Sequence, residues 1–344
     1  MSKVVYLLGA GASYGKRKDA LTEPGVSRII EGLPVVNEIN DEIDAVIDLI
    51  RSSVSPEHSR QYEIENRKYS FDEMKSMLIK DFEWLKEESS NHATIDTFAR
   101  TLLLQREFKN YVRLKYLLCT FFLIEQTIHP FDKRYETFFT NILDENGLIP
   151  DDIYIITWNY DSQLGIVYRK YGSGNLNVYE PHELPTQLPK AKVFKINGTA
   201  SYHGYQGVVP YFLSDRDKDA LIERVFKQYE IVSERGFYSD GSLDLLFAWE
   251  KMIDENMQKH LAQNLTDAEV LVVIGYTFPF FNRKMDRMIF SNLPSLKKIY
   301  IQDPNADSIK EFIGSVMTEE QRNTQLPDIK TIKNISNFFL PPEL

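Results

Sequence analysis

Five residues near the start of the sequence are of the types that bind phosphate through their backbone. They directly follow an apolar run and are Gly9, Ala10, Gly11, Ala12 and Ser13. Because glycine has no side chain and tolerates positive φ, the amides of such a turn can approach a pyrophosphate closely. A tight turn from a strand into a helix, without a ligand, is the alternative interpretation. The segment departs from the GxGxxG pattern because Tyr14 stands where the third glycine would be.

An amide and a carboxylate follow a second apolar run. Asn159 and Asp161 are two residues apart, and in an extended segment such residues point to the same side. An asparagine can hold a ribose hydroxyl or a water molecule, and an aspartate can accept a hydrogen bond from a carboxamide. An Asx turn that ends the strand is the alternative interpretation.

Three further apolar runs also end in polar or glycine-containing turns. These turns contain Asn197 and Gly198, Gly275 and Thr277, and Asp303 and Asn305. Asp303 suits a ribose diol, for which a carboxylate at a strand end is a common acceptor. Asp-Pro-Asn is equally a common turn sequence, so a structural role for Asp303 is the alternative.

The apolar runs predict the strands that must position these residues. The runs cover residues 3–8, 152–157, 192–196, 269–274 and 298–301. Strands that are apolar on both faces are typical of a parallel sheet between helices. Ligands bind such sheets in the crevice outside the carboxyl ends of the strands. We therefore expect an α/β fold with a Rossmann-like parallel sheet and a site at that edge.

The remaining sequence is mainly helical in pattern. Residues 36–50 have an amphipathic helical spacing, residues 71–126 read as almost continuous helix, and residues 51–70 read as a polar surface loop. We expect one domain over residues 1–344. Its Rossmann-like core would comprise residues 1–50 and 150–344, with an inserted helical module over residues 51–149.

Composition excludes several classes of function. With 40 basic and 50 acidic residues the net charge is −10, which argues against a duplex-DNA binder or a polybasic membrane binder. No apolar run reaches the roughly 18 residues that a membrane span needs. The single cysteine, Cys119, lies in an apolar helical stretch, so we expect it to be packed, with no disulfide framework and a cytoplasmic location. The spacing of the six histidines predicts no metal site.

The motifs, in this order, resemble those of the sirtuin superfamily and, within it, the bacterial sirtuin-like proteins linked to NAD hydrolysis in phage defence. Residues 9–13 resemble the family's GAGxS turn, residues 32–34 its G-[IL]-P, residues 157–161 its T-x-N-x-D, and residues 275–277 its G-[TY]-[ST] turn. Residues 303–305 occupy the last ribose-contacting position. The resemblance therefore covers most of the chain.

The resemblance implies NAD as the ligand and a role for each motif. Residues 9–13 would hold the pyrophosphate, Asn159 would orient the nicotinamide ribose or a water, and Asp161 would bind the carboxamide. Thr277 and Asn305 would contact phosphate and the adenosine ribose. A homo-oligomer, or a partner protein, would switch on such a hydrolase.

Two features depart from the family pattern. The catalytic histidine of the family belongs to a His-Gly pair after the third strand, where this chain has Asn197-Gly198. Asparagine cannot act as a general base near neutral pH. His203 follows shortly after and could return to the site, although an ordinary loop histidine is the alternative. One cysteine also cannot build the four-cysteine zinc module of deacetylating sirtuins.

Three hypotheses follow from these observations: an NAD hydrolase, a non-catalytic sensor of NAD or an ADP-ribose-type nucleotide, and, third, a protein deacylase. The presence of both Asn159 and Asp161 favours the hydrolase. Cleavage of the nicotinamide–ribose bond passes through an oxocarbenium-like state. Asn159 and Asn197 could favour that state by positioning and electrostatics without a histidine.

Overall fold

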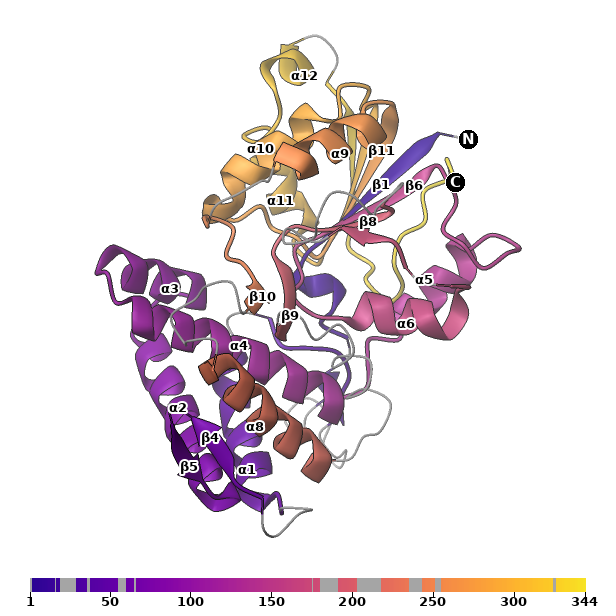
Figure 1. Ribbon diagram of the computed structural model, residues 1–344. Helices are drawn as coiled ribbons and strands as arrows, with labels where there is room; N and C mark the ends of the chain where they lie inside the picture. Colours follow the sequence, from indigo (N-terminus) through magenta and orange to yellow (C-terminus); the bar gives the residue numbers. More distant parts are fainter. Residues whose placement is uncertain are drawn as a thin grey trace. The chain divides into compact units, whose positions relative to one another are not determined.

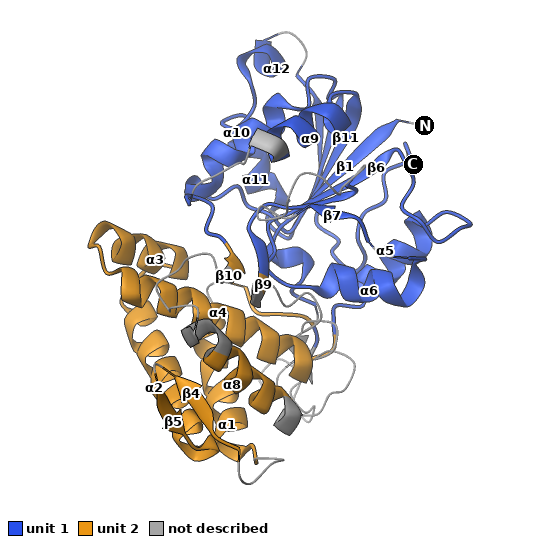
Figure 2. Ribbon diagram, viewed as in Figure 1, with its two compact units in different colours: residues 1–31, 131–199, 246–344 blue, residues 32–130, 200–245 orange. Residues whose placement is uncertain are grey.

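The structure is a computed structural model in two compact units. It describes residues 2–15, 17–18, 29–35, 38–54, 60–64, 66–174, 176–179, 191–202, 218–234, 243–250, 255–323 and 326–344 (Figure 1). Unit 1 comprises residues 1–31, 131–199 and 246–344, and unit 2 comprises residues 32–130 and 200–245 (Figure 2).

A seven-stranded sheet forms the centre of unit 1. Its strands, in spatial order, are β13 (Asp328–Ile332), β12 (Lys298–Gln302), β11 (Ala268–Ile274), β1 (Lys3–Leu8), β6 (Ile153–Thr157), β8 (Val193–Lys195) and β7 (Val178–Tyr179). All neighbouring pairs are parallel. The expected α/β fold with a Rossmann-like parallel sheet is confirmed, and the five predicted strands all belong to this sheet.

Helices cover both faces of the sheet, so that successive residues of β1 alternate between two apolar cores. Val5 and Leu7 belong to the core on one face, and Val4, Tyr6 and Leu8 to the core on the other. The first face is covered by α9 (Glu255–Leu265), α10 (Arg283–Ser291) and α11 (Ala306–Ile313), and the second by α5 (Arg134–Ile142) and α6 (Gln163–Tyr171) (Figure 1). Burial on both faces explains why the strands are apolar throughout.

β1 lies at the point in the sheet where the strand order reverses. It pairs with β6 on one side and with β11 on the other, so the chain continues from β1 toward both edges of the sheet. At such a switch point the connections diverge and leave a crevice at the carboxyl ends of the strands. The turn after Leu8 therefore lies where α/β sheets bind ligands.

Unit 2 is mainly helical. It contains α1 (Ile39–Ser52), α2 (Phe71–Ser90), α3 (Ile95–Leu104), α4 (Phe108–Ile128) and α8 (Lys218–Glu234), with a hairpin of β4 (Tyr62–Ile64) and β5 (Arg67–Tyr69). The predicted helices over residues 71–126 are confirmed. Cys119 is fully buried in α4. Residues 51–70, expected to form a loop, contain the hairpin.

The two units divide the chain at points that differ from the expected single domain with a module over residues 51–149. α5 packs on the sheet of unit 1. Residues 200–245 supply α8 to unit 2, where the Phe226 ring lies 5.5 Å from the Tyr62 ring and 5.1 Å from the Phe71 ring. These long-range contacts are not visible in the local sequence pattern.

The remaining helices and strands are short. They are the 3-10 turns η1 (Ala10–Ala12) and η4 (Phe280–Asn282), the strand pair β2 (Arg17–Lys18) and β3 (Ile29–Ile30), the strand pair β9 (Gly198–Tyr202) and β10 (Leu243–Leu245), and α12 (Glu319–Asn323). Within the described ranges, no helix has both the length and the apolar character needed to cross a membrane.

Candidate functional site

Most backbone amides of the glycine-rich turn already donate hydrogen bonds to carbonyl oxygens of the protein. Gly9 continues the extended strand, and η1 follows it at once. Four amides donate to protein carbonyl oxygens: Gly9 to Ile274 (3.0 Å), Gly11 to Gly275 (3.0 Å), Ala12 to Gly9 (2.9 Å) and Ser13 to Ala10 (3.0 Å). The amide of Ala10 has no partner in the part of the chain that the structure describes, and Ala10 is exposed. The turn therefore presents one free N–H to a ligand.

Close packing between two turns explains why this segment is rich in glycine. A Cβ on Gly9 would lie 2.5 Å from the carbonyl oxygen of Gly275, and a Cβ on Gly11 would lie 2.8 Å from the Gly275 Cα. Gly275 itself has φ +58°. These glycines are required by the contact between the ends of β1 and β11, whether or not a ligand binds.

Asn159 and Asp161 converge on Ser13. The Asn159 Nδ2 donates to the Ser13 Oγ at 3.0 Å, and the Asp161 carboxylate is also hydrogen-bonded to Ser13. All three side chains are more than nine-tenths buried. Burial raises the pKa of Asp161, while the nearby Lys195 ammonium opposes that shift. The structure thus brings together the polar residues predicted at the ends of β1 and β6.

Four buried side chains outside the predicted motifs hold this turn in place. Arg134 Nη2 donates to the Gly11 carbonyl at 2.8 Å, Gln163 Nε2 donates to the Ser13 carbonyl at 3.0 Å, and the Tyr135 hydroxyl lies 3.1 Å from Ser13 Oγ. Asp132 pairs with Arg134 and accepts from the Gly15 amide at 2.9 Å. All four lie outside the predicted helical stretches of residues 36–50 and 71–126, and their contacts with the turn follow only from the fold.

Asn197 occupies the end of β8, beside this group. Its Nδ2 donates to the Trp158 carbonyl at 3.2 Å, and the preceding Lys195 donates from Nζ to the Asp161 carbonyl at 2.6 Å. Gly198, with φ +66°, is the first residue of β9, so Asn197 lies in the two-residue turn between β8 and β9. Asn197 is 7% exposed, and its buried Oδ1 has no hydrogen-bond partner among the described residues.

An unpartnered buried carbonyl carries a free-energy cost of about 1–3 kcal/mol. A donor from a ligand or a water molecule would remove that cost at the Asn197 Oδ1. The Asn197 Oδ1 is therefore an acceptor that no described residue satisfies, and a ligand or a water molecule could supply its donor.

The ends of β11 and β12 carry the remaining predicted residues. Thr277 and Asn305 are exposed, whereas Asp303 is 9% exposed. Asp303 Oδ1 accepts from the Asn305 amide at 2.8 Å, so the Asp-Pro-Asn segment forms the turn that was the alternative role for Asp303. Thr277 and Asn305 are therefore accessible to a ligand, and Asp303 shapes the turn that carries Asn305.

The histidines of the described residues lie outside this group. His203 lies outside the described residues. His92 stacks on Phe98, His129 pairs with Glu125, and His260 packs on Tyr179. Within the described ranges, no group of three or more histidine, cysteine or acidic side chains is placed to hold a metal ion.

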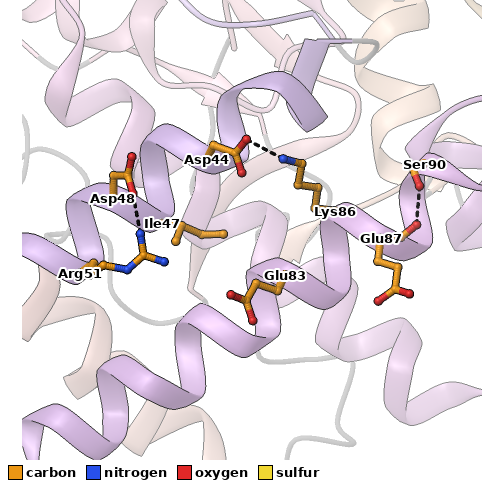
Figure 3. A pocket seen from close by; sticks show the side chains of 8 residues that line it. All are labelled: Asp44, Ile47, Asp48, Arg51, Glu83, Lys86, Glu87 and Ser90. Carbon is orange, nitrogen blue, oxygen red and sulfur yellow. Dashed lines mark hydrogen bonds and ion pairs between the residues drawn. The ribbon is translucent and has the colours of Figure 1, made fainter.

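Two cavities of the structure lie in unit 2. The larger, about 660 Å³, lies between α1 and α2, where Lys86 pairs with Asp44 and Arg51 with Asp48 (Figure 3). A second, of about 390 Å³, adjoins β5 and α2. Neither is lined by a residue of the candidate site.

No model of a known protein family matches this chain, and no curated protein matches it. Function is therefore inferred from the geometry of the site and from the resemblance of its motifs.

Proposed function

We propose that unit 1 binds NAD at the carboxyl edge of its sheet and hydrolyses it to nicotinamide and ADP-ribose, as a sirtuin-like protein would. One observation carries the proposal. Ser13, Asn159, Asp161 and Asn197, from three neighbouring strand ends, are buried at this edge, and the Asn197 Oδ1 has no partner among the described residues.

We assign each residue of the site to one part of NAD. The free Ala10 amide would contact the pyrophosphate above β1. Asp161 would accept from the carboxamide, Asn159 would orient the nicotinamide ribose, and Asn197 Oδ1 would accept from a ribose hydroxyl or a water. Thr277 and Asn305, both exposed, would contact the adenosine half.

The proposed reaction needs little proton transfer at the leaving group. The oxygen of a water molecule bonds to C1′ of the ribose while the bond from C1′ to the nicotinamide nitrogen breaks. The electron pair of that bond stays on the nitrogen, which is cationic in NAD, so nicotinamide leaves as a neutral molecule and the water proton passes to solvent. Without a histidine general base we expect a rate reduced by about 10²–10⁴-fold.

Nicotinamide release tests the proposal directly. Purified protein is incubated with NAD, and nicotinamide is measured by chromatography while unfolding is followed with and without ADP-ribose. We expect slow release and a higher melting temperature with ADP-ribose, because a ligand that binds only the folded state stabilises it. The absence of any shift with NAD or ADP-ribose at millimolar concentration would refute the dinucleotide site.

A non-catalytic nucleotide sensor is the second candidate. It is favoured by Asn197 at the family's histidine position and by the hydrogen bonds that commit Asn159 and Asp161 to Ser13. Binding of NAD without nicotinamide release, in every assembly state of the protein, would identify the sensor. A protein deacylase is the third candidate, and none of the observations above favours it.

The proposal extends to the biological setting that the resemblance implies. It includes a cytoplasmic location, a role in antiviral defence and activation through a homo-oligomer or a partner protein. Release of nicotinamide that rises with protein concentration, together with a change in molecular mass by light scattering, would support activation by self-assembly.

A further inference from the structure

Two exposed phenylalanine rings follow β11. Phe280 is 72% exposed and Phe281 is 42% exposed, and both belong to the single turn η4. Their ring centroids are 6.5 Å apart with an interplanar angle of 79°. Two adjacent exposed aromatic rings form a surface suited to contact with another flat group.

The loop that carries these rings begins at the candidate site, and its other end is hydrogen-bonded back to Tyr276. It starts at Gly275, whose backbone touches Gly11. It returns at Asn282, whose Nδ2 donates to the Tyr276 hydroxyl at 2.9 Å. Between them, Phe278 is buried with φ +52°, a strained conformation for a residue other than glycine. The loop is thus anchored inward at its ends while its two other rings face outward.

A cation accompanies the rings. The Arg283 guanidinium lies 4.9 Å from the centroid of the Phe280 ring, at the start of α10. Aromatic rings stack on nucleobases, and guanidinium groups attract phosphate. The combination matches the chemistry of a nucleotide better than that of an uncharged apolar ligand.

We infer that the adenine base of the bound dinucleotide stacks on the Phe280 ring and meets the Phe281 ring edge to face, since the two rings are nearly perpendicular. This inference rests on the proposed function. The sheet order supports the choice of base. β6 and β11 lie on opposite sides of β1. With the nicotinamide at Asn159 and Asp161 after β6 and the pyrophosphate above β1, the adenosine half extends toward β11, where η4 lies. The site would therefore select adenine dinucleotides over nicotinamide mononucleotide.

Calorimetric titration of the full-length protein tests this inference. The probes are NAD, ADP-ribose and nicotinamide mononucleotide, and the variants are Phe280→Ala, Phe281→Ala and Phe280→Trp. We expect Phe280→Ala to weaken NAD and ADP-ribose binding about tenfold, the loss of one base–aromatic stack. Phe281→Ala, which removes only an edge contact, should weaken it less, and both variants should leave binding of the mononucleotide unchanged. Phe280→Trp should retain the affinity because indole also stacks.

Phe312→Ala is the matched control. Phe312 is 56% exposed but lies seven residues beyond Asn305, near the far end of α11. At 1.5 Å per residue it is about 10 Å along the helix from the carboxyl edge. We expect no change in nucleotide affinity for this variant. An equal loss in both variants would mean that exposed rings act nonspecifically, which would overturn the inference.

The remaining outcomes separate the two proposals. If the wild type binds NAD and Phe280→Ala binds it equally well, the inference is wrong and the proposed function stands. If the wild type binds none of the three probes, both fall. If the alanine variants change the molecular mass in solution without changing NAD affinity, the rings form a contact between copies of the chain, and the inference is again wrong.

Discussion

Gly11 and Gly275 are in backbone contact across the ends of β1 and β11. The Gly11 amide donates to the Gly275 carbonyl at 3.0 Å, and a Cβ on Gly275 would lie 2.5 Å from the Gly11 Cα. The obstructing atoms are backbone, so they cannot rotate away as a side chain could. The fold itself therefore requires the glycines of the turn, before any role in ligand binding is considered. A substitution here reports on stability before it reports on any ligand.

Gly11→Ala should lower the free energy of unfolding in the absence of nucleotide by about 1–3 kcal/mol, since the added methyl group forces the two turns apart. Denaturant unfolding without ligand measures the effect. Gly165→Ala is the matched control, because a Cβ on this α6 glycine meets nothing within 4 Å. Alanine there should stabilise by about 0.5–1 kcal/mol. If Gly11→Ala were instead as stable as the wild type and had lost NAD binding, the glycine would be required for the ligand and not for the fold.

Ala10→Pro should weaken nucleotide binding while the fold persists. Proline lacks the one amide of the turn that has no partner among the described residues, and the first position of a helical turn accepts proline. Gly9 has φ −111° and ψ −172°, an extended conformation that suits the residue before proline. Loss of a hydrogen bond to a charged phosphate should weaken binding about tenfold or more.

Ala10→Val provides the control for bulk at the same position. Valine adds a side chain of similar size to the proline ring but keeps the N–H, so we expect its affinity to stay closer to that of the wild type. The two variants are compared by calorimetric titration with ADP-ribose. Equal affinity in the proline variant and the wild type would show that the Ala10 amide does not contact the ligand.

The central strands were predictable because each is a continuous apolar run buried on both faces. The two strands of the central sheet that sequence reasoning missed lack this pattern. β13 has a mixed sequence with no buried residue, as an outer strand of the sheet can have, and β7 has only two residues. The β4–β5 hairpin was hidden for the same reason, since the β5 sequence Arg-Lys-Tyr carries no fully buried residue.

The site was predictable in its location but not in its internal bonding. Strand ends in a parallel sheet meet at one edge, which is why Ser13, Asn159 and Asn197 could be expected together. The hydrogen bond from Arg134 to the Gly11 carbonyl depends on how α5 packs against the sheet, and no local sequence spacing predicts that contact. The sequence also does not reveal that the Gly11 amide donates a hydrogen bond to the Gly275 carbonyl. The turn therefore offers fewer free amides than its glycine content suggests.

Asn159→Ala should abolish nicotinamide release if the protein is a hydrolase. Asn159 bonds Ser13 and is 9% exposed at a strand end, so we expect the variant to fold, with a loss of at most a few kcal/mol in unfolding free energy. Melting curves without ligand check the fold. Asn197→His should keep or raise the rate, because it places a general base at the position that the family uses.

His203→Ala separates two routes for the proton. A rate at least a hundredfold lower would assign proton transfer to His203, whereas an unchanged rate would show that no base is needed there. NAD binding without release in the wild type and in Asn197→His would contradict the hydrolase and favour the sensor.

Asp286 makes stability depend on pH from within the apolar core beside the site. It is fully buried in α10, and the Tyr276 hydroxyl donates to its Oδ1 at 2.8 Å and lies 3.0 Å from its Oδ2. Burial raises the pKa of Asp286 from 3.8 to about 8, against the opposing effects of the Tyr276 hydrogen bond and the Arg283 charge. The folded chain therefore retains a proton between pH 4 and 8 that the unfolded chain releases.

Stability should consequently fall as the pH rises through that window, because the unfolded state binds fewer protons than the folded state there. Asp286→Asn carries no charge and keeps an oxygen for the Tyr276 hydroxyl. We expect equal stability of variant and wild type near pH 4. By pH 8.5 the variant should be more stable by a few kcal/mol, since each pKa unit corresponds to about 1.4 kcal/mol. Asp307→Asn is the control, because Lys333 lowers the pKa of Asp307 and its substitution should give no such gain. Parallel pH profiles of unfolding free energy for the wild type and Asp286→Asn would show that Asp286 is ionised in the folded protein.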